Sequence, residues 1–181
     1  LTIVSIARKM ISGQTLIANG LFLEIWFAYL LTRKRYVCKV PGDIVWERAK
    51  NTSYTELDID SFQRIRLGTK YKIFRYLFSQ SLKSASLVIV PSSHLKSLCL
   101  SWGIAPGKIH LIHNSVDTDI FIPLSQSRLY DVVVVNRLVA WKHVDKIIEA
   151  CLQLELSLLV IGDGPERKSL EKIASKSNSI T

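Results

Sequence analysis

The chain has 181 residues, of which 24 are Lys or Arg and 15 are Asp or Glu, so its formal net charge is +9. Its share of 48% apolar and 22% charged residues is typical of a globular protein and excludes a disordered, collagenous or low-complexity chain. Three widely spaced cysteines, Cys38, Cys99 and Cys151, form neither a disulfide framework nor the paired spacing of a zinc site, so we expect reduced thiols.

The two ends of the sequence and its most apolar window bear on its class. The chain starts at Leu1 rather than at a methionine and stops shortly after a strand-turn-helix unit, so we expect a central fragment that lacks both ends. The window 15–32 contains Asn19, Gly20 and Glu24, which are costly to bury in lipid. It therefore predicts a buried or interfacial helix rather than a membrane span.

Strand-like and helix-like segments alternate in the first part of the chain, as in parallel α/β proteins. The strands expected there are residues 15–18, 36–40, 87–90 and 109–112. The helices expected there are residues 21–31, a long helix from 60 or 61 to about 83, and residues 93–102. The residues between 41 and 58 are expected to form a polar loop.

The second part of the chain repeats the same alternation after a connector. Residues 117–128 lack helical periodicity and contain Pro123, so we place a domain boundary there, which gives domains 1–122 and 123–181. The elements expected beyond it are strands 130–135 and 156–161 and helices 143–152 and 166–174.

Two cations follow the first strand of the second domain. The carboxyl end of a parallel strand faces the ligand crevice of an open sheet, so Arg137 is expected at its rim. Lys142 is expected at the start of the next helix, where the dipole favours anions. Together they suit a pyrophosphate, and ordinary solvated charges are the alternative.

A glycine turn follows the second strand of this domain. Gly162, Asp163 and Gly164 stand between that strand and the next helix, a position that permits close approach of a nucleotide. The third glycine of the dinucleotide fingerprint is missing. A tight structural turn is therefore an equal alternative.

The stretch 39–48 of the first domain combines groups that seldom share a plain connection. Trp46 is costly to leave in water, while Asp43, Glu47 and Arg48 are costly to bury unpaired. A polar substrate pocket would accommodate all four. The alternative is an ion pair of Asp43 or Glu47 with Arg48, with Trp46 in the core.

The long helix predicted in the first domain has a basic face that suits an anionic membrane surface. The cations expected within one arc of this helix are Arg64, Lys72, Arg75 and Lys83. An apolar stripe lies beside them, so a solvated helix packed on the sheet is the alternative. Gly68 could also break the first turns away from this helix. Nucleic acid is not expected as the anionic partner, because no nucleic-acid-binding motif accompanies the charge. The four histidines form no metal-ligand set, so no metal is expected.

Several ordered stretches resemble the family-4 retaining glycosyltransferases. VVVVNRLVAWKHVDKIIEACLQL, LLVIGDGPERKSLEKIA and KIHLIHNSVDTDIFIP resemble the donor-nucleotide half and the hinge. ANGLFLE, KVPGDIVWERAKN and LVIVPSSHLKSLCLSWGI resemble the acceptor-side domain. The resemblance implies an α/β fold of the GT-B type, with two Rossmann-like parallel-sheet domains facing across a cleft. Both domains would be incomplete in this chain.

The resemblance also implies roles for individual residues. Arg137 and Lys142 match the pair that holds the donor pyrophosphate and stabilises the leaving diphosphate. Gly162, Asp163 and Gly164 would line the nucleotide pocket. Asp43 is the candidate contact to the reacting sugar, with Trp46, Glu47 and Arg48 shaping the acceptor side. Asn136 and His143 depart from the glycines usual in the family.

The function implied by this resemblance is sugar transfer, with retention and no cofactor, from a UDP- or GDP-linked donor to a glycan or lipid-linked acceptor. We expect a bacterial, cytoplasmic enzyme of cell-surface polysaccharide synthesis, peripheral at the inner face of the membrane. The family's C-terminal glutamate pair would lie beyond Thr181, so weak or absent turnover is expected of these residues alone. The alternatives are a nucleotide-sugar epimerase of the same architecture and a non-enzymatic basic protein that binds membranes or nucleic acid.

Overall fold

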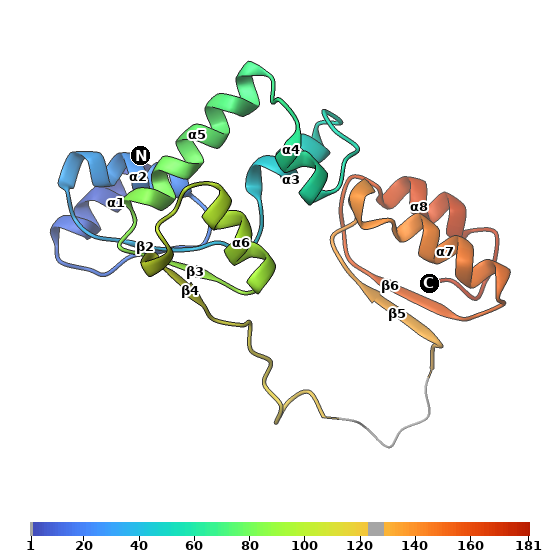
Figure 1. Ribbon diagram of the computed structural model, residues 1–181. Coiled ribbons are helices and arrows are strands. Elements are labelled where there is room, and N and C mark those ends of the chain that lie inside the picture. The colour runs from blue at the N-terminus through green and yellow to red at the C-terminus, as the bar shows by residue number, and fades with distance from the viewer. Residues whose placement is uncertain (1, 123–128) are drawn as a thin grey trace. The chain divides into compact units, whose positions relative to one another are not determined.

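The computed structural model describes residues 2–122 and 129–181 (Figure 1). The chain forms two compact units, Leu1–Asp117 and Thr118–Thr181, which we call unit 1 and unit 2. The predicted domain boundary adjoins residues 123–128, which lie outside the described part of the chain. Within the described residues, no helix has the length and apolar character that a membrane crossing requires.

Unit 1 is built on a four-stranded parallel sheet. Its strands follow one another in space in chain order, and they are β1 (Ile17–Ala18), β2 (Val37–Lys39), β3 (Leu87–Val90) and β4 (Ile109–Leu111). The central strand β3 has its predicted bounds, because a short β-branched run that ends at a proline is typical of a buried parallel strand. The α/β fold class predicted from the sequence is confirmed.

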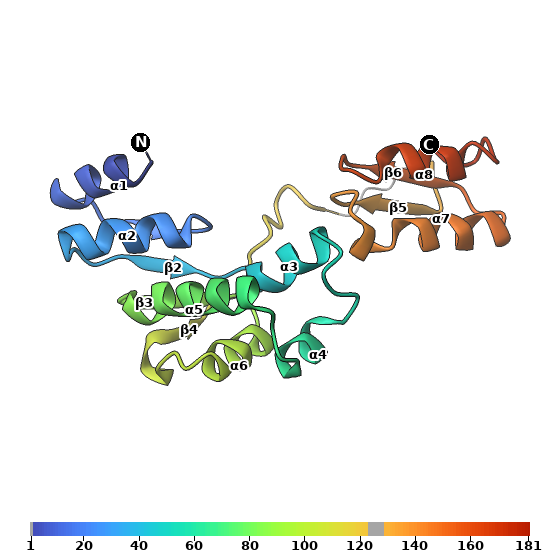
Figure 2. The ribbon, with the colours of Figure 1, turned by 90° about the horizontal axis from the view of Figure 1, so that it is seen from above.

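Six α-helices accompany this sheet among the described residues. They are α1 (Thr2–Ile11), α2 (Phe22–Thr32), α3 (Ile44–Asn51), α4 (Ile59–Arg64), α5 (Thr69–Ser84) and α6 (Ser93–Ser101). Helix α2 contacts both α1 and α5, whereas α6 packs on β3 and β4 (Figure 2). A 3-10 turn, η1 (Pro106–Lys108), leads into β4. The core includes Phe22, Phe78 and Trp102, and the ring of Phe78 contacts the rings of the other two.

Three parts of unit 1 differ from the prediction. Helix α1 is not among the predicted elements. The polar loop predicted over 41–58 is wrong, because it contains α3, whose first amides are capped by the carboxylate of Asp43. The long helix is two helices: Asp58 rather than residue 60 or 61 caps α4, and the chain becomes extended at Ile65 before α5 begins after Gly68.

The basic face predicted for the long helix is therefore not formed. Arg64 belongs to α4, not to α5, and the side chain of Arg75 is turned inward, where it pairs with buried Asp43. The apolar stripe of α5 packs on the core through Tyr71, Phe78 and Leu82. Lys72 and Lys83 stay exposed, as the alternative of a solvated helix packed on the sheet requires.

Unit 2 is smaller and follows the predicted order of elements. Its parallel strands β5 (Val132–Val135) and β6 (Leu158–Ile161) pair along their whole length. Helices α7 (Val144–Gln153) and α8 (Arg167–Ala174) contact each other, and a 3-10 turn, η2 (Ala140–Lys142), precedes α7. Ile180 forms a parallel bridge with Leu158, so the residues before Thr181 also pair with β6.

Candidate functional site

The carboxyl edge of the unit 2 sheet is held together by main-chain hydrogen bonds that extend beyond the strands. The amide of Asn136 donates to the carbonyl of Ile161 at 3.0 Å, and the amide of Leu138 donates to the carbonyl of Asp163 at 2.9 Å. The Leu138 carbonyl in turn accepts from the amide of Glu166 at 3.1 Å. The loop after β5 is thus fastened to the glycine turn after β6.

This fastening requires the two glycines of the turn. A Cβ atom at Gly162 would lie 1.9 Å from the carbonyl oxygen of Asn136, and one at Gly164 would lie 2.2 Å from that of Leu138. Both distances are far inside van der Waals contact, so no side chain fits at either position. The structure therefore shows a tight structural turn, in agreement with the alternative interpretation of these glycines. Nucleotide contact by them stays a prediction.

Arg137 and Lys142 both lie on the segment that this fastening holds. Both are exposed, and the ammonium group of Lys142 lies 4.6 Å from the centre of the Trp141 ring. Helix α7 begins at Val144, two residues after Lys142, and the side chain of its N-cap residue, His143, forms no capping hydrogen bond. Two cations and the start of a helix thus lie along one segment at the carboxyl end of β5, which suits an anion.

At His143, the backbone has the conformation that the family's usual glycine favours. His143 is the residue just before α7 and has a φ of 50°, in the left-handed region where glycine is the least strained residue. Asp163, on the neighbouring turn, accepts a hydrogen bond from the Gly164 amide at 2.8 Å and lies 4.0 Å from Arg167. Its predicted contact to a nucleotide stays a prediction.

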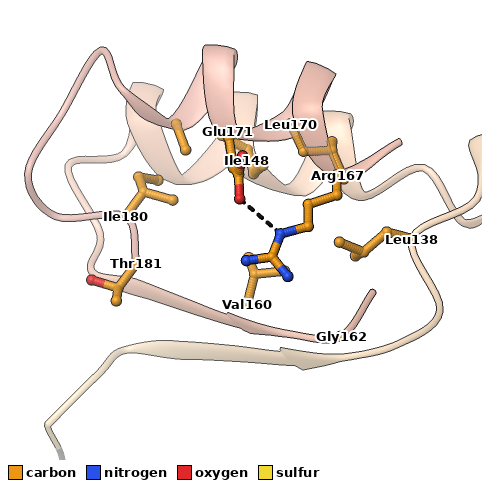
Figure 3. A pocket seen from close by; sticks show the side chains of 10 residues that line it. Leu138, Ile148, Val160, Gly162, Arg167, Leu170, Glu171, Ile180 and Thr181 are labelled. Atoms are coloured by element: carbon orange, nitrogen blue, oxygen red, sulfur yellow. Dashed lines mark hydrogen bonds and ion pairs between the residues drawn. The ribbon is translucent and has the colours of Figure 1, made fainter. Parts of the chain in front are cut away.

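A cavity of about 160 Å³ lies behind the glycine turn (Figure 3). Its lining is mostly apolar, with Leu138, Val160 and Ile180 among its residues, and the ion pair between Arg167 and Glu171 borders it at 2.8 Å. Gly162 is the one predicted site residue among those that line it. Arg167 and Glu171 are not among the predicted site residues, because i, i+4 charge pairs are common on helix surfaces.

The carboxyl edge of unit 1 is organised around Asp43. This residue is fully buried, and one oxygen, Oδ1, accepts from the amides of Val45 and Trp46 at 2.9 and 3.2 Å. The other oxygen, Oδ2, accepts from Gln63 Nε2 at 2.9 Å and from the guanidinium of Arg75. The Asp43 form of the predicted alternative, an ion pair with Arg48, is wrong, because the partner of Asp43 comes from α5.

Further contacts enclose this pair. Trp102 Nε1 donates to Gln63 Oε1 at 3.0 Å, and the Trp102 ring lies 4.8 Å from the Arg75 guanidinium. Burial raises the pKa of the nearby Cys99 to about 12, and the negative charge of Asp43 adds to this rise. Asp43 therefore has a structural role. Its predicted contact with the reacting sugar stays a prediction, which would require the pair with Arg75 to open.

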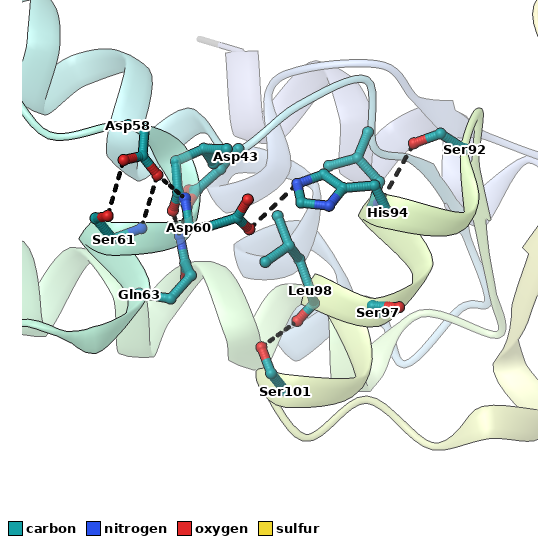
Figure 4. Close-up of polar contacts among 12 residues, drawn as sticks. Asp43, Asp58, Asp60, Ser61, Gln63, Ser92, His94, Ser97, Leu98 and Ser101 are labelled. Carbon is teal, nitrogen blue, oxygen red and sulfur yellow. Dashed lines mark hydrogen bonds and ion pairs between the residues drawn. The ribbon is translucent and has the colours of Figure 1, made fainter.

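Around Asp43, polar contacts join α4 to α6 (Figure 4). Asp58 accepts two hydrogen bonds from Ser61, which hold the pKa of this carboxyl below its usual range. On the same helix, Asp60 lies 3.5 Å from the imidazole of His94, at the start of α6.

Two of the four predicted acceptor-side residues line a cavity. Glu47 and Arg48 border a space of about 260 Å³, together with Glu24, Gly20 and Asn51. Trp46 lies outside this lining and donates to the carbonyl of Leu57 at 3.0 Å, while it packs partly on the core. The guanidinium of Arg48 lies 4.5 Å from the centre of the Phe74 ring, which also borders the cavity.

Glu24 and Asn51 are members of this cavity that the sequence did not predict. Both residues end stretches that resemble the acceptor-side domain of the family, ANGLFLE and KVPGDIVWERAKN, but neither is among the predicted site residues. Leu21 lines the same cavity with a φ of 46°, in the left-handed region that a leucine seldom adopts. Strained residues of this kind cluster at functional sites.

The chain is similar to known proteins both in its sequence and in its fold. Residues 47–120 match the family described as Glycosyltransferase Family 4. A phosphatidylinositol N-acetylglucosaminyltransferase subunit from Arabidopsis thaliana is 30% identical over 97 residues, which are 49% of this chain and 22% of that protein. The present chain thus spans about a fifth of the length of this curated relative.

Two solved structures resemble the fold over 99% of the chain. HepE from Anabaena, in complex with UDP-glucose, has a TM-score of 0.72 at 16% identity, and the match covers 50% of that chain. TarM from S. aureus, in complex with fondaparinux, alpha-GlcNAc-glycerol and UDP, has a TM-score of 0.67 at 12% identity over 35% of that chain. These findings confirm the resemblance to family-4 glycosyltransferases and the GT-B type of fold.

Proposed function

We propose that this chain is part of a glycosyltransferase that transfers a sugar, with retention, from a nucleotide-linked donor to a glycan or lipid-linked acceptor. The carboxyl edge of unit 2 carries this proposal, because a fastened loop there carries exposed Arg137 and Lys142 and leads into the uncapped start of α7. A diphosphate accumulates negative charge as it leaves the sugar. Fixed cations stabilise such charge better than water does.

The comparisons support this assignment in two ways. The family match to residues 47–120 supports glycosyl transfer in general. HepE was solved with UDP-glucose and TarM with UDP, which supports a UDP-linked donor for the protein to which this chain belongs. On the acceptor side, we propose the cavity bordered by Glu24, Glu47 and Arg48. Synthesis of cell-surface polysaccharide at the inner face of the membrane is the proposed setting.

Binding of the donor tests the proposal directly with this chain. Titration calorimetry with UDP-glucose is expected to show binding that falls at least about tenfold in the double variant Arg137→Gln/Lys142→Gln, since hydrogen bonds to charged groups each contribute about 1.5–3 kcal/mol. The matched control is Lys168→Gln/Lys172→Gln, which removes the same charge from exposed positions on α8. Equal affinity in the two double variants would reject Arg137 and Lys142 as the donor site.

A further inference from the structure

The net positive charge of the protein belongs to one of its two units. Residues 1–117 contain 16 Lys and Arg against seven Asp and Glu, a net charge of +9. Residues 118–181 contain eight of each and are neutral overall. The excess therefore has no connection with the cation pair of unit 2, and it requires an explanation within unit 1.

Within unit 1, five cations gather where α1 and α2 end. Helices α1 and α2 contact each other (Figure 2), and Thr32 Oγ1 lies 3.5 Å from Met10 Sδ, so their carboxyl ends lie together. The cations at these ends are Arg8, Lys9, Arg33, Lys34 and Arg35, all of them exposed. The only acidic residue among residues 1–42 is Glu24, which lies in the first turn of α2, at the opposite end of the helix.

Large apolar side chains are exposed at the same place. Ile11, the last residue of α1, is 65% exposed, and Leu31, next to the last residue of α2, is 73% exposed. Phe27 and Leu30 extend the exposed apolar surface along α2. The opposite faces of both helices are already packed on the core, so these four side chains have not been displaced from it.

A cavity lies between these helix ends and the amino ends of the strands. Its volume is about 210 Å³, and Lys34 and Arg35 line it together with Gln14, Thr15 and Ser86. Thr15 precedes β1 and Ser86 precedes β3, so the cavity is at the edge of the sheet opposite Asp43. Two cations beside polar side chains offer the chemistry that a phosphate ester requires.

We propose that the basic end, defined as Arg8, Lys9, Ile11, Leu31, Arg33, Lys34 and Arg35, binds the surface of a membrane that contains anionic phospholipid. The five cations face the lipid phosphates, Ile11 and Leu31 enter the boundary between headgroups and acyl chains, and the cavity accepts one headgroup phosphate. Basic residues beside exposed large apolar side chains are what an interfacial segment requires. The proposal is independent of sugar transfer.

Helix dipoles alone do not account for this arrangement. The negative end of each helix favours a nearby cation, which explains a basic residue in the last turn of α1. It explains neither the two exposed apolar side chains nor Arg35, which lies beyond α2 and lines the cavity. Nucleic acid would be matched by the charge but not by exposed Ile11 and Leu31, so we favour the membrane.

Co-sedimentation of the whole chain with vesicles tests how much the cations of the basic end contribute to membrane binding. We expect binding to vesicles of phosphatidylglycerol and phosphatidylcholine, and little to vesicles of phosphatidylcholine alone. The triple variant Arg33→Gln/Lys34→Gln/Arg35→Gln is expected to bind roughly ten- to a hundredfold more weakly, since each cation contributes on the order of 1 kcal/mol near such a surface. The control triple variant Arg64→Gln/Arg66→Gln/Lys72→Gln removes the same charge from exposed positions and should bind nearly as well as the native chain.

A second pair of variants tests the apolar contribution. Ile11→Ser/Leu31→Ser should lose the part of vesicle binding that persists at high salt, whereas Ile73→Ser/Leu154→Ser, also at exposed positions, should retain it. Circular dichroism verifies that each variant is folded. Equal losses in both triple variants or equal binding to neutral vesicles would each overturn the proposal. Retention of duplex DNA without vesicle binding would overturn it as well.

Discussion

Gly162 and Gly164 let two loops of unit 2 approach closely enough for their main chains to pair. Their α-hydrogens face carbonyl oxygens of Asn136 and Leu138, which a Cβ atom would displace. We expect Gly162→Ala and Gly164→Ala each to lower the free energy of unfolding by about 3 kcal/mol, because overpacking against main chain forces it to move. Denaturant unfolding measures the loss, and both variants should also bind UDP-glucose less tightly.

Gly107 provides the matched control for these two substitutions. A Cβ atom there would meet nothing within 4 Å, so Gly107→Ala should change the free energy of unfolding by less than about 0.5 kcal/mol. If Gly162→Ala and Gly164→Ala were as harmless as Gly107→Ala, the close approach of the two loops would not exist in solution.

Single residues show how far the sequence could predict the candidate sites. Arg137 and the glycine turn were placed correctly at the carboxyl edge of unit 2, because each closely follows a strand that the apolar pattern defines, and Lys142 was placed just before the next helix. The partners of Asp43 could not be predicted in this way. Arg75 is 32 positions away along the chain, and only the packing of α5 beside α3 brings it to that carboxylate.

At the level of elements, prediction succeeded where burial is strong and failed where an element is short and polar. Strand β3 is apolar throughout, and its bounds were predicted to the residue. Helix α3 has eight residues with four charged or amide side chains, so its apolar pattern is too weak to distinguish it from a loop. The carboxylate of Asp43 just before it was its one clear starting signal.

The buried pair of Asp43 and Arg75 fastens α3 to α5, and its removal should loosen both helices. Asp43→Ala is expected to lower the free energy of unfolding by about 3–5 kcal/mol, because it leaves the Arg75 guanidinium buried without its counter-charge and uncaps α3. Asp43→Asn should cost less, since its amide oxygen can still cap the helix. Urea unfolding monitored by tryptophan fluorescence measures both.

A double variant and a change in a surface ion pair test whether the loss of stability comes from the direct interaction of Asp43 with Arg75 or from removal of any charge. Asp43→Asn/Arg75→Met removes both charges and should recover part of the stability that either single change loses. Glu56→Gln breaks the surface pair with Lys50, in which the Glu56 side chain is largely exposed, and should cost less than about 1 kcal/mol. Strictly additive losses in the double variant would contradict a direct interaction between Asp43 and Arg75.

For the whole molecule, the alternation of strands and helices was enough to predict parallel α/β units, because parallel strands need a long crossover connection and a helix usually provides it. The distribution of charge needed the structure. The sequence placed the basic surface on one long helix, whereas the fold breaks that helix, buries Arg75 and brings distant cations together at the ends of α1 and α2. Spacing along the chain carries no information about such an encounter.

The separation of charge between the units predicts two different responses to salt. Vesicle binding depends on the five cations of the basic end of unit 1, so raising sodium chloride from low to physiological concentration should weaken it steeply as the Debye length falls to about 8 Å. UDP-glucose would bind to unit 2, which is neutral overall and offers short-range contacts, so its affinity should fall much less. Sedimentation with vesicles and calorimetry with UDP-glucose, in the same buffers, give the slope of the logarithm of each affinity against the logarithm of the salt concentration. Equal slopes would mean that vesicles and UDP-glucose both respond to the electrostatic field of the whole chain. The assignment of vesicles to unit 1 and UDP-glucose to unit 2 would then be wrong.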